Sequence, residues 1–487
     1  MDYHKLTVKE IRDLIKAKKI TAVEVTQDFL KIIKEKDPEI KAYITVCEDF
    51  ALEQAKAVDE KIAKGETIGS LAGVPYALKD NYLTKGIETT SGSQVLKGYI
   101  PQYSAEMYER LKAADAVLLG KTNLDTFAFG ASTENSGYFT THNPHDLERV
   151  PGGSSGGSVA AVAANMCAFA LGSDTGGSIR QPSSFCGTIG LKVTYGRNSR
   201  YGMTAMASSF DTPGPITKTV EDAAIILQVM AGLDEKDSTT SPTPVPDYSA
   251  VVGNADVSVE ASAESDPHSL QGIKLGLPKE YFIEGMQPEV EQVVKAAAKK
   301  YEEMGAEIVE ISLPHTDYGL AVYYILVPCE ISANMARYDG IRFGQSEEGA
   351  ENIIDYYVKT RGKYMEPELK RRIMIGSYAL SAGYFDAYYL KASKVRTLIK
   401  EDFQKAFEQV DAIIAPTAPT TAFKIGEKAG DPLQMYLSDV FTVNANVAGI
   451  PSINIPVGKD ENGLPIGMQI MGNYFEEGKI MKIANRF

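Results

Sequence analysis

Residues 172–182 read Gly-Ser-Asp-Thr-Gly-Gly-Ser-Ile-Arg-Gln-Pro, and an earlier loop, residues 151–158, reads Pro-Gly-Gly-Ser-Ser-Gly-Gly-Ser. Glycine lets the backbone turn sharply and approach a ligand closely, so neighbouring N–H groups can point into one small volume. When such a loop carries a serine, it can form an oxyanion hole beside a nucleophile. Tight turns with solvated serines would give the same local sequence, so the two loops alone leave both interpretations open.

A serine nucleophile needs a base, and this chain has few histidines that could serve as one. Ser178 does not stand in a Gly-x-Ser-x-Gly motif, and the only histidines are His4, His142, His145, His268 and His315. A buried lysine can act instead, because burial lowers its pKa toward neutrality. Lys79 is the leading candidate, since it ends the apolar run Val74–Leu78, although a lysine at a strand end can also be a surface residue. The residues therefore indicate a serine hydrolase with a lysine base.

The composition of the chain limits the class of protein. Its 487 residues include 50 Lys and Arg against 64 Asp and Glu, which gives a formal net charge of −14. Hydrophobic residues make up 44% and charged residues 23%, values that are typical of globular proteins and exclude a disordered or fibrous chain. The acidic balance argues against nucleic-acid binding by this chain itself, because such binding needs clustered Lys and Arg. A reducing, cytoplasmic setting is indicated by four widely spaced cysteines, Cys47, Cys167, Cys186 and Cys329.

The pattern of apolar residues predicts a mixed α/β architecture. Two Thr-x-x-Glu capping boxes, beginning at Thr7 and Thr21, predict that residues 1–70 are largely helical. From Leu71 onward, short apolar runs alternate with helical stretches, as is typical of α/β proteins. The longest apolar-rich run, Val159–Leu171, is shorter than the roughly 20 residues of a membrane span and predicts a buried core helix.

The second half of the chain continues this alternation. The spacing predicts a strand at Ile273–Leu277, a helix at Glu289–Met304 and a strand at Ile308–Leu313. Between the two halves, Ser238–Gly272 is rich in Ser, Thr, Pro and Asp and is predicted to be a surface excursion.

No metal or nucleotide site is predicted in this chain. Gly120-Lys121-Thr122 ends like a phosphate-binding loop, but Asp115 stands where such a loop requires glycine. His142 and His145 lie on either side of Asn143-Pro144 with no third ligand nearby, so a loop-surface role is favoured over metal binding.

A third segment, residues 73–81, reads Gly-Val-Pro-Tyr-Ala-Leu-Lys-Asp-Asn. Together with the two Gly-Ser loops it resembles the amidase signature family, including the order and spacing of Lys79, Ser154 and Ser178. The similarity runs from about residue 5 to the end of the chain. The resemblance implies the α/β fold of that family, a large mixed central β-sheet covered by helices on both faces, as one domain over residues 1–487.

Within that family, the chain is most similar to the glutamine-hydrolysing subunits of tRNA-dependent amidotransferases. The segments that carry this similarity are 143–151, 194–197, 377–384, 394–399 and 467–470.

The resemblance also implies a Ser-Ser-Lys triad. Ser178 would attack a carboxamide carbon, and Ser154, which follows a cis peptide bond in this family, would relay the proton to Lys79. The lysine must be neutral to act as the base. The developing oxyanion would be held by backbone amides of Thr175, Gly176 and Gly177, each worth roughly 3–4 kcal/mol in comparable enzymes.

Recognition of free glutamine needs partners for its α-carboxylate and α-ammonium groups. The resemblance places these on Arg372 and Asp439, with Tyr323 as a further contact. A guanidinium suits a carboxylate and a carboxylate suits an ammonium group. The adjacent residues Arg371 and Tyr324 remain open as alternatives.

The family further implies a heterotrimer with two other subunits. This chain would supply ammonia to convert Glu-tRNA(Gln) or Asp-tRNA(Asn) to the amidated form, while ATP, Mg²⁺ and most of the tRNA would bind the partner subunit. No cofactor would bind this chain. The alternatives are a stand-alone amidase acting on another small carboxamide and an inactive scaffold; the presence of Lys79, Ser154 and Ser178 disfavours the scaffold.

Overall fold

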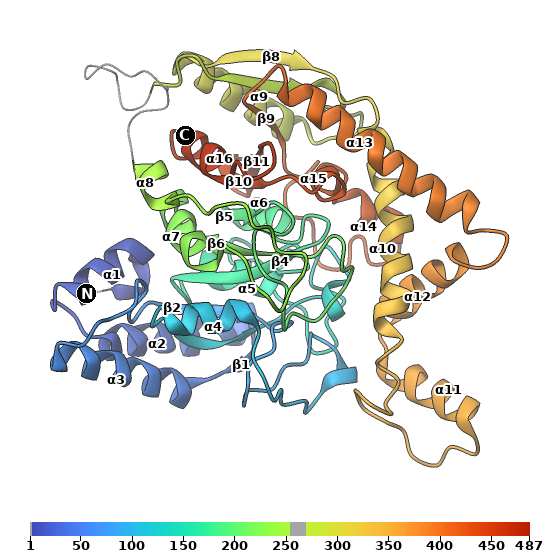
Figure 1. Ribbon diagram of the computed structural model, residues 1–487, viewed down its shortest axis with the longest axis horizontal. Coiled ribbons are helices and arrows are strands. Elements are labelled where there is room, and N and C mark those ends of the chain that lie inside the picture. Colours follow the sequence, from blue (N-terminus) through green and yellow to red (C-terminus); the bar gives the residue numbers. More distant parts are fainter. Residues whose placement is uncertain (1, 254–268) are drawn as a thin grey trace.

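The computed structural model describes residues 2–253 and 269–487, and one sheet of eleven strands runs through this part of the chain (Figure 1). The strands β3, β2 and β4 run parallel to one another, as do β9, β7 and β8, and the remaining neighbours are antiparallel. The mixed α/β sheet expected from the sequence is therefore confirmed. Across the sheet the order is β1 (Tyr43–Val46), β3 (Val117–Thr122), β2 (Pro75–Lys79), β4 (Phe169–Asp174), β6 (Thr212–Thr217), β5 (Ile189–Lys192), β10 (Ser452–Lys459), β11 (Pro465–Met471), β9 (Ala412–Pro416), β7 (Lys274–Pro278) and β8 (Glu307–Ile311).

Helices pack against the sheet along its length. In Figure 1, α1 to α3 lie beside the β1 end, α9 and α13 lie near β8, and α10 to α12 extend along one side of the molecule. The first half of the chain contributes α1 (Val8–Lys16), α2 (Ala22–Ile40), α3 (Glu48–Lys64), α4 (Glu106–Ala113), α5 (Gly156–Ala163), α6 (Arg180–Cys186), α7 (Val220–Met230) and α8 (Tyr248–Gly253). The second half contributes α9 (Pro288–Glu303), α10 (Gly319–Met335), α11 (Ile353–Tyr364), α12 (Pro367–Ala379), α13 (Lys391–Phe407), α14 (Pro432–Leu437), α15 (Val443–Ala448) and α16 (Glu477–Ala484).

The N-terminal region is helical but not throughout. Both predicted capping boxes are confirmed: the Thr7 and Thr21 side chains accept from the backbone N–H three residues on, and the glutamates reach back. The expectation of helix over residues 1–70 missed β1, which pairs with β3 as an edge strand. Four residues are too few to show strand alternation between two strong helical patterns.

The prediction of one core helix at Val159–Leu171 was wrong. The helix α5 ends at Ala163, Asn165 adopts φ 59°, and the chain then enters the buried strand β4. Asparagine tolerates the left-handed conformation, which breaks a helix. A short apolar run that is buried on all sides has no period that distinguishes helix from strand.

Three later predictions are confirmed within one or two residues. The segments predicted at Ile273–Leu277, Glu289–Met304 and Ile308–Leu313 are β7, α9 and β8. Of the predicted surface excursion, residues 254–268 lie outside the described residues. The part before them is packed, because Tyr248 of α8 is fully buried in the core.

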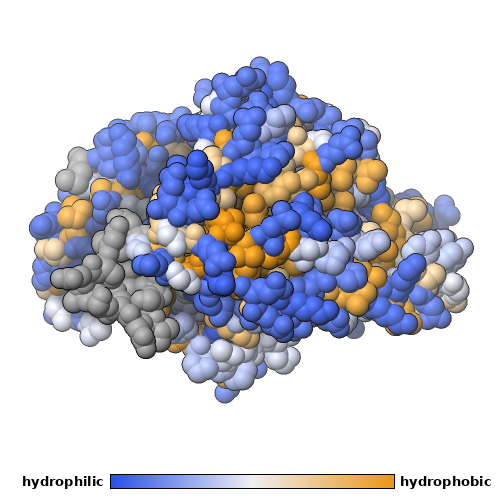
Figure 2. Space-filling model, turned by 90° about the horizontal axis from the view of Figure 1, so that it is seen from above, coloured by the Kyte–Doolittle hydropathy of each residue, from blue (hydrophilic) through white to orange (hydrophobic). Residues whose placement is uncertain are grey.

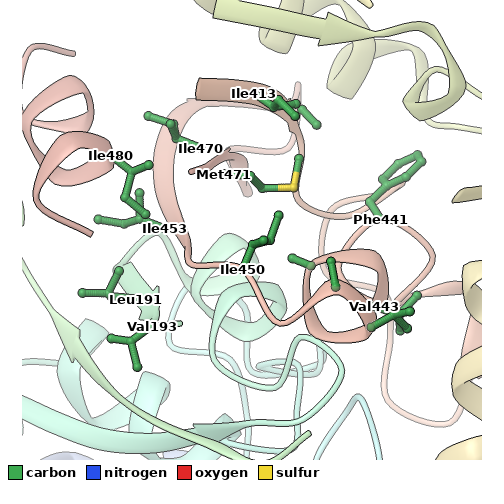
Figure 3. Close-up of a cluster of buried hydrophobic side chains, with 14 of the residues drawn as sticks. Leu191, Val193, Ile413, Phe441, Val443, Ile450, Ile453, Ile470, Met471 and Ile480 are labelled. Carbon is green, nitrogen blue, oxygen red and sulfur yellow. The ribbon is translucent and has the colours of Figure 1, made fainter. Parts of the chain in front are cut away.

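The core consists mainly of two clusters of buried apolar side chains. One gathers residues of the first half, such as Phe29 and Leu118. The other extends over the second half of the sheet, where Leu191, Ile453 and Ile470 meet (Figure 3). Seen from above, polar residues dominate the surface and apolar ones gather near its centre (Figure 2). Among the described residues, no helix has both the length and the hydropathy to cross a membrane.

Candidate active site

Lys79 is the last residue of β2 and is fully buried. Because β2 and β4 run parallel, their carboxyl ends meet at the same edge of the sheet, which brings Ser173 of β4 beside Lys79. Lys79 Nζ lies 2.8 Å from Ser154 Oγ and 2.9 Å from both Ser155 Oγ and Ser173 Oγ. A snorkelling surface lysine is therefore excluded, and the amine is held among three hydroxyls.

Burial lowers the pKa of Lys79 to about 7, because a desolvated ammonium group is disfavoured. The carboxylates of Asp125, Asp174 and Asp211 oppose this change but do not cancel it. Near neutral pH a large fraction of the amine is therefore unprotonated. A neutral amine 2.8 Å from a serine hydroxyl has the geometry of a general base.

Two further residues of the lysine environment were missed by the sequence analysis. Ser173 accepts hydrogen bonds from Lys79 and from Asn81 Nδ2, the latter at 3.0 Å, while Ser155 Oγ donates to the Ser173 carbonyl. Asn81 and Ser173 stand in the same motifs as Lys79 and Ser178. Their signal was a polar side chain near the carboxyl end of a largely apolar strand: Ser173 lies within β4, and Asn81 follows β2 by two residues.

Ser154 lies in the loop before α5, and the peptide bond between Gly153 and Ser154 is cis, as the resemblance implied. The loop is tied to α6, because Gly153 N–H donates to Gln181 Oε1 at 3.1 Å. Ser155 N–H donates to the carbonyl oxygen of Ser178 at 3.1 Å, which joins the two Gly-Ser loops directly. The structure thus brings Lys79, Ser154 and the Ser178 loop together.

Asp174 organises the turn that carries Ser178. Its carboxylate accepts from the N–H groups of Gly177 and Ile179 and pairs with the fully buried guanidinium of Arg180. Burial alone would raise the pKa of Asp174, but Arg180 and Asn446 hold it at about 2. The carboxylate is therefore ionised at all working pH values and fixes the loop. Neither Asp174 nor Arg180 was assigned a role from the sequence.

The backbone N–H groups of this turn that do not bind Asp174 are the candidates for an oxyanion hole. Of the three residues predicted, Gly177 directs its N–H to Asp174 at 2.9 Å, so that amide is already engaged. Gly177 also has φ 129°, and a Cβ there would collide with Thr442. Thr175 fixes the turn through its hydroxyl, which donates to Asp211 Oδ1 at 2.7 Å. The Ser178 side chain is 8% exposed, and within the described residues its hydroxyl makes no hydrogen bond.

Arg372 of α12 is 3% exposed, and its guanidinium carbon faces the rings of Tyr324 and Tyr436 at 4.9 and 5.2 Å. Its Nε donates to Glu368 Oε1 at 2.7 Å. Arg371 also pairs with Glu368, but its side chain is 43% exposed. Of the two arginines left open by the sequence, Arg372 is the one enclosed among aromatic rings.

Asp439 follows α14 and is buried, with 7% of its surface exposed. Burial raises the pKa of its carboxyl well above the ordinary value, although Arg372 opposes this change. Across residues 2–253 and 269–487, no group of the protein donates a hydrogen bond to this carboxylate. An ammonium group placed there would compensate a buried anion.

Tyr323 lies against the Ser178 turn, because a Cβ on Gly176 would collide with its ring. Tyr324 instead stacks on Tyr436, with ring centroids 3.9 Å apart. The two adjacent tyrosines therefore serve different sides of the site, Tyr323 toward the serine and Tyr324 toward Arg372.

A cavity of about 120 Å³ adjoins the arginine side of the site. Arg371, Arg372 and Lys428 contribute positive charge to its wall, and Glu134 and Glu368 contribute negative charge. Residues 130–132 form another part of the lining. This part is linked to the Ser154 loop, because Gln181 binds both the Ala131 carbonyl and Gly153 N–H. The cavity lining does not include Lys79, Ser178 or Asp439. Its full lining is Gly130, Ala131, Ser132, Glu134, Asn135, Tyr324, Glu368, Arg371, Arg372, Lys428, Ala429, Pro432, Met435 and Tyr436.

The histidines set aside as metal ligands have structural contacts. His145 Nε2 lies 3.0 Å from the Cys186 carbonyl, and His142 Nδ1 lies 2.6 Å from the Leu147 carbonyl. Among the described residues, no group of three or more His, Cys, Asp or Glu side chains is arranged to hold a metal ion.

Comparisons with known proteins show the family of this chain. The model of the amidase family matches residues 24–481. The A subunit of glutamyl-tRNA(Gln) amidotransferase from Carboxydothermus hydrogenoformans is 54% identical over 487 residues, which is 100% of this chain and 97% of that protein. The same-named protein of Thermoanaerobacter pseudethanolicus is 52% identical over 100% of this chain and 96% of that protein.

Solved structures show the same relationship. The crystal structure of the corresponding glutamyl-tRNA(Gln) amidotransferase protein from Thermotoga maritima, also an A subunit, matches with a TM-score of 0.80 and 41% identity, over 99% of this chain and 94% of that chain. The peptide amidase of Stenotrophomonas maltophilia matches with a TM-score of 0.82 and 30% identity, over 99% of this chain and 96% of that chain. The chain therefore belongs to the amidase family, and its full-length relatives within that family include the A subunits of glutamyl-tRNA(Gln) amidotransferases.

Proposed function

We propose that this chain is the glutamine-hydrolysing subunit of a tRNA-dependent amidotransferase. The observation that carries the proposal is the buried Lys79 amine, with a pKa of about 7, 2.8 Å from Ser154 Oγ. A lysine that loses its proton near neutral pH can activate a serine without any histidine. The sequence similarity to amidotransferase A subunits, which extends over the full length of the chain, supports glutamine as the amide substrate.

In the proposed mechanism, the Ser178 hydroxyl attacks the carboxamide carbon of glutamine. Its proton passes to Ser154 Oγ as the Ser154 proton passes to Lys79 Nζ. The collapsing tetrahedral intermediate takes this proton on its nitrogen and releases ammonia, leaving a glutamyl ester on Ser178. Water then attacks the ester, with the same relay accepting its proton, and glutamate leaves as Ser178 regains its hydrogen. The sum is glutamine plus water to glutamate plus ammonia.

Selectivity for free glutamine would come from two buried charges. Arg372 would bind the α-carboxylate and Asp439 the α-ammonium group, with Tyr323 lining the path to Ser178. A stand-alone amidase for an apolar carboxamide would have no use for both groups, and burying the Asp439 carboxyl without a hydrogen-bond donor is costly. The enclosed Arg372 and Asp439 therefore favour the amino-acid substrate over the stand-alone amidase.

The ammonia would be used elsewhere in a multi-subunit assembly, as the name of the relatives indicates for those proteins. We place ATP and Mg²⁺ at a partner subunit, together with most of the contacts to Glu-tRNA(Gln) or Asp-tRNA(Asn), in a heterotrimer. The formal charge of −14 on this chain is consistent with tRNA binding to the partner.

The proposal is tested by purifying the complex through a tag on this chain and measuring ammonia and glutamate release from glutamine. We expect equal amounts of both products and co-purification of the partner subunits. A chain that is recovered alone, ignores glutamine and cleaves other small amides would establish the stand-alone amidase instead.

The pH dependence of the reaction should follow the loss of the proton from the Lys79 amine. Because the base must be neutral and its pKa is about 7, kcat/KM for glutamine should rise about tenfold per pH unit below pH 7 and level off above it. Asp125 and Asp211, whose pKa values burial raises to about 6, lose protons over the lower part of this range and make the limb less steep there. A profile measured from pH 5.5 to 9 (about the range in which the fold is expected to persist) checks this. A rate that falls as pH rises from 6 to 8 would contradict the role of Lys79.

Replacing Arg372 with alanine should raise KM for glutamine by about 100-fold, because a bidentate, charge-assisted contact is lost. Arg371→Ala is the matched control, and we expect it to change KM by less than about tenfold, since that side chain is half exposed. Initial-rate kinetics on both variants decide the assignment. The reverse order of effects would move the carboxylate contact to Arg371.

A further inference from the structure

Glu368 lies in the first turn of α12 and is 6% exposed. Its Oε1 accepts two hydrogen bonds, from Arg372 Nε at 2.7 Å and from the Tyr436 hydroxyl at 2.9 Å. Its other oxygen pairs with Arg371. One buried carboxylate therefore joins both arginines of α12 to an aromatic residue of α14.

The contact restricts how Arg372 can bind an anion. A guanidinium offers five N–H groups and can grip a carboxylate through its Nε edge or through its two terminal nitrogens. Glu368 occupies Nε, and in the described part of the chain Arg372 donates no other side-chain hydrogen bond. The two terminal nitrogens are therefore the end left for a substrate carboxylate.

The second contact joins the two halves of the proposed glutamine site. The Tyr436 hydroxyl donates to Glu368, and the Tyr436 carbonyl accepts from the N–H of Asp439 at 3.1 Å. Tyr436 thus connects the carboxylate beside Arg372 to the backbone that carries Asp439. The Tyr436 ring is held in place by stacking on the Tyr324 ring.

The charges also balance in a way that suits a zwitterion. Glu368 pairs with both Arg371 and Arg372, so one negative charge faces two positive charges. The remaining positive charge suits an α-carboxylate, and Asp439 is the acidic group for an α-ammonium group. Without Glu368 the same wall of the cavity would carry two uncompensated arginines. A neutral carboxamide with both α-groups matches the balanced arrangement, and substrates that lack one of the groups do not.

We infer that Glu368, held with Tyr436, is a positioning residue that aims the terminal nitrogens of Arg372 and sets the selectivity for an α-amino-acid amide. The inference rests on the proposed glutamine hydrolysis and adds a residue that acts through Arg372. It does not involve Lys79, Ser154 or Ser178.

The test uses the purified complex and compares Glu368→Gln and Tyr436→Phe with the wild type. Glu368→Gln keeps the shape but removes the charge, and we expect KM for glutamine to rise about 10- to 50-fold with kcat within about threefold. Tyr436→Phe removes one hydroxyl and should raise KM about three- to tenfold, also without loss of kcat. Glu368→Asp, which keeps the charge at shorter reach, should fall between Glu368→Gln and the wild type.

The matched control is Glu366→Gln, which removes a carboxylate two residues away. Glu366 binds Ser93 and Thr126 and does not contact Arg372. Its loss should lower the melting temperature and leave KM unchanged. The inference is overturned if Glu368→Gln and Tyr436→Phe both keep KM within about twofold of the wild type, or if Glu366→Gln raises KM as much as Glu368→Gln does. A wild-type complex that releases no ammonia from glutamine would overturn the proposed function itself.

Discussion

Replacing Ser178 with alanine is expected to lower glutamine-dependent ammonia release by about 10⁴-fold or more, because a nucleophile that forms the covalent intermediate cannot be bypassed. The Ser178 hydroxyl makes no hydrogen bond among the described residues, so its removal leaves no unpaired group behind. The fold should therefore be retained, with a change in unfolding free energy below about 1 kcal/mol. Ammonia is measured directly after incubation with saturating glutamine.

The same variant separates the two half-reactions of the proposed complex. If ammonium chloride is supplied, amidation of the charged tRNA should recover, since ATP and tRNA would act at the partner subunit. Full glutamine-dependent activity in Ser178→Ala would remove this serine as the nucleophile. Loss of the ammonium-supported reaction as well would show that the variant damages the assembly rather than the chemistry.

The second large effect is expected for Lys79→Met, which should lower kcat by about 10³-fold and abolish the rise of the rate between pH 6 and 8. Methionine fills most of the space of the lysine stem without supplying a base. The hydroxyls of Ser154, Ser155 and Ser173 then lose their common partner, which adds a moderate loss of stability.

Lys192→Met provides a close control for this experiment. Lys192 is also fully buried and its pKa is also lowered to about 7 by burial, but its ammonium group donates to the carbonyls of Val193 and Ile450. Its replacement should lower the melting temperature while the pH limb of the reaction persists. Equal losses of kcat in the two variants would reduce Lys79 to a structural role.

The sequence predicted the parts of this molecule whose patterns are local. Capping boxes gave the starts of α1 and α2, and the apolar run before Lys79 gave β2. The same reasoning failed at Val159–Leu171, because a fully buried segment has no amphipathic period and the break depends on one asparagine.

The candidate site divides in the same way. Lys79, Ser154 and Ser178 stand in recognisable motifs. Lys79 ends β2 and Ser178 follows β4, and these strands are parallel neighbours, so the topology places both residues at the same edge of the sheet. Arg372 and Asp439 carry no local signal and came from family resemblance alone. Glu368 stands four residues before Arg372, a spacing that allows an ion pair on a helix. Only the fold shows that its carboxylate is buried and also accepts a hydrogen bond from Tyr436.

The contacts of Arg180 have a consequence for the synthesis of the protein. Its guanidinium, which holds Asp174 and so the Ser178 turn, is bound in turn by Asn446 and by Gln469 of β11. A nascent chain leaving the ribosome contains every residue of the proposed triad once Ser178 has emerged, yet it lacks the side-chain amides of Asn446 and Gln469 that complete the Arg180 network. Ester formation on Ser178 should therefore begin only after almost the entire polypeptide has been translated. Unfinished chains would then not hydrolyse glutamine.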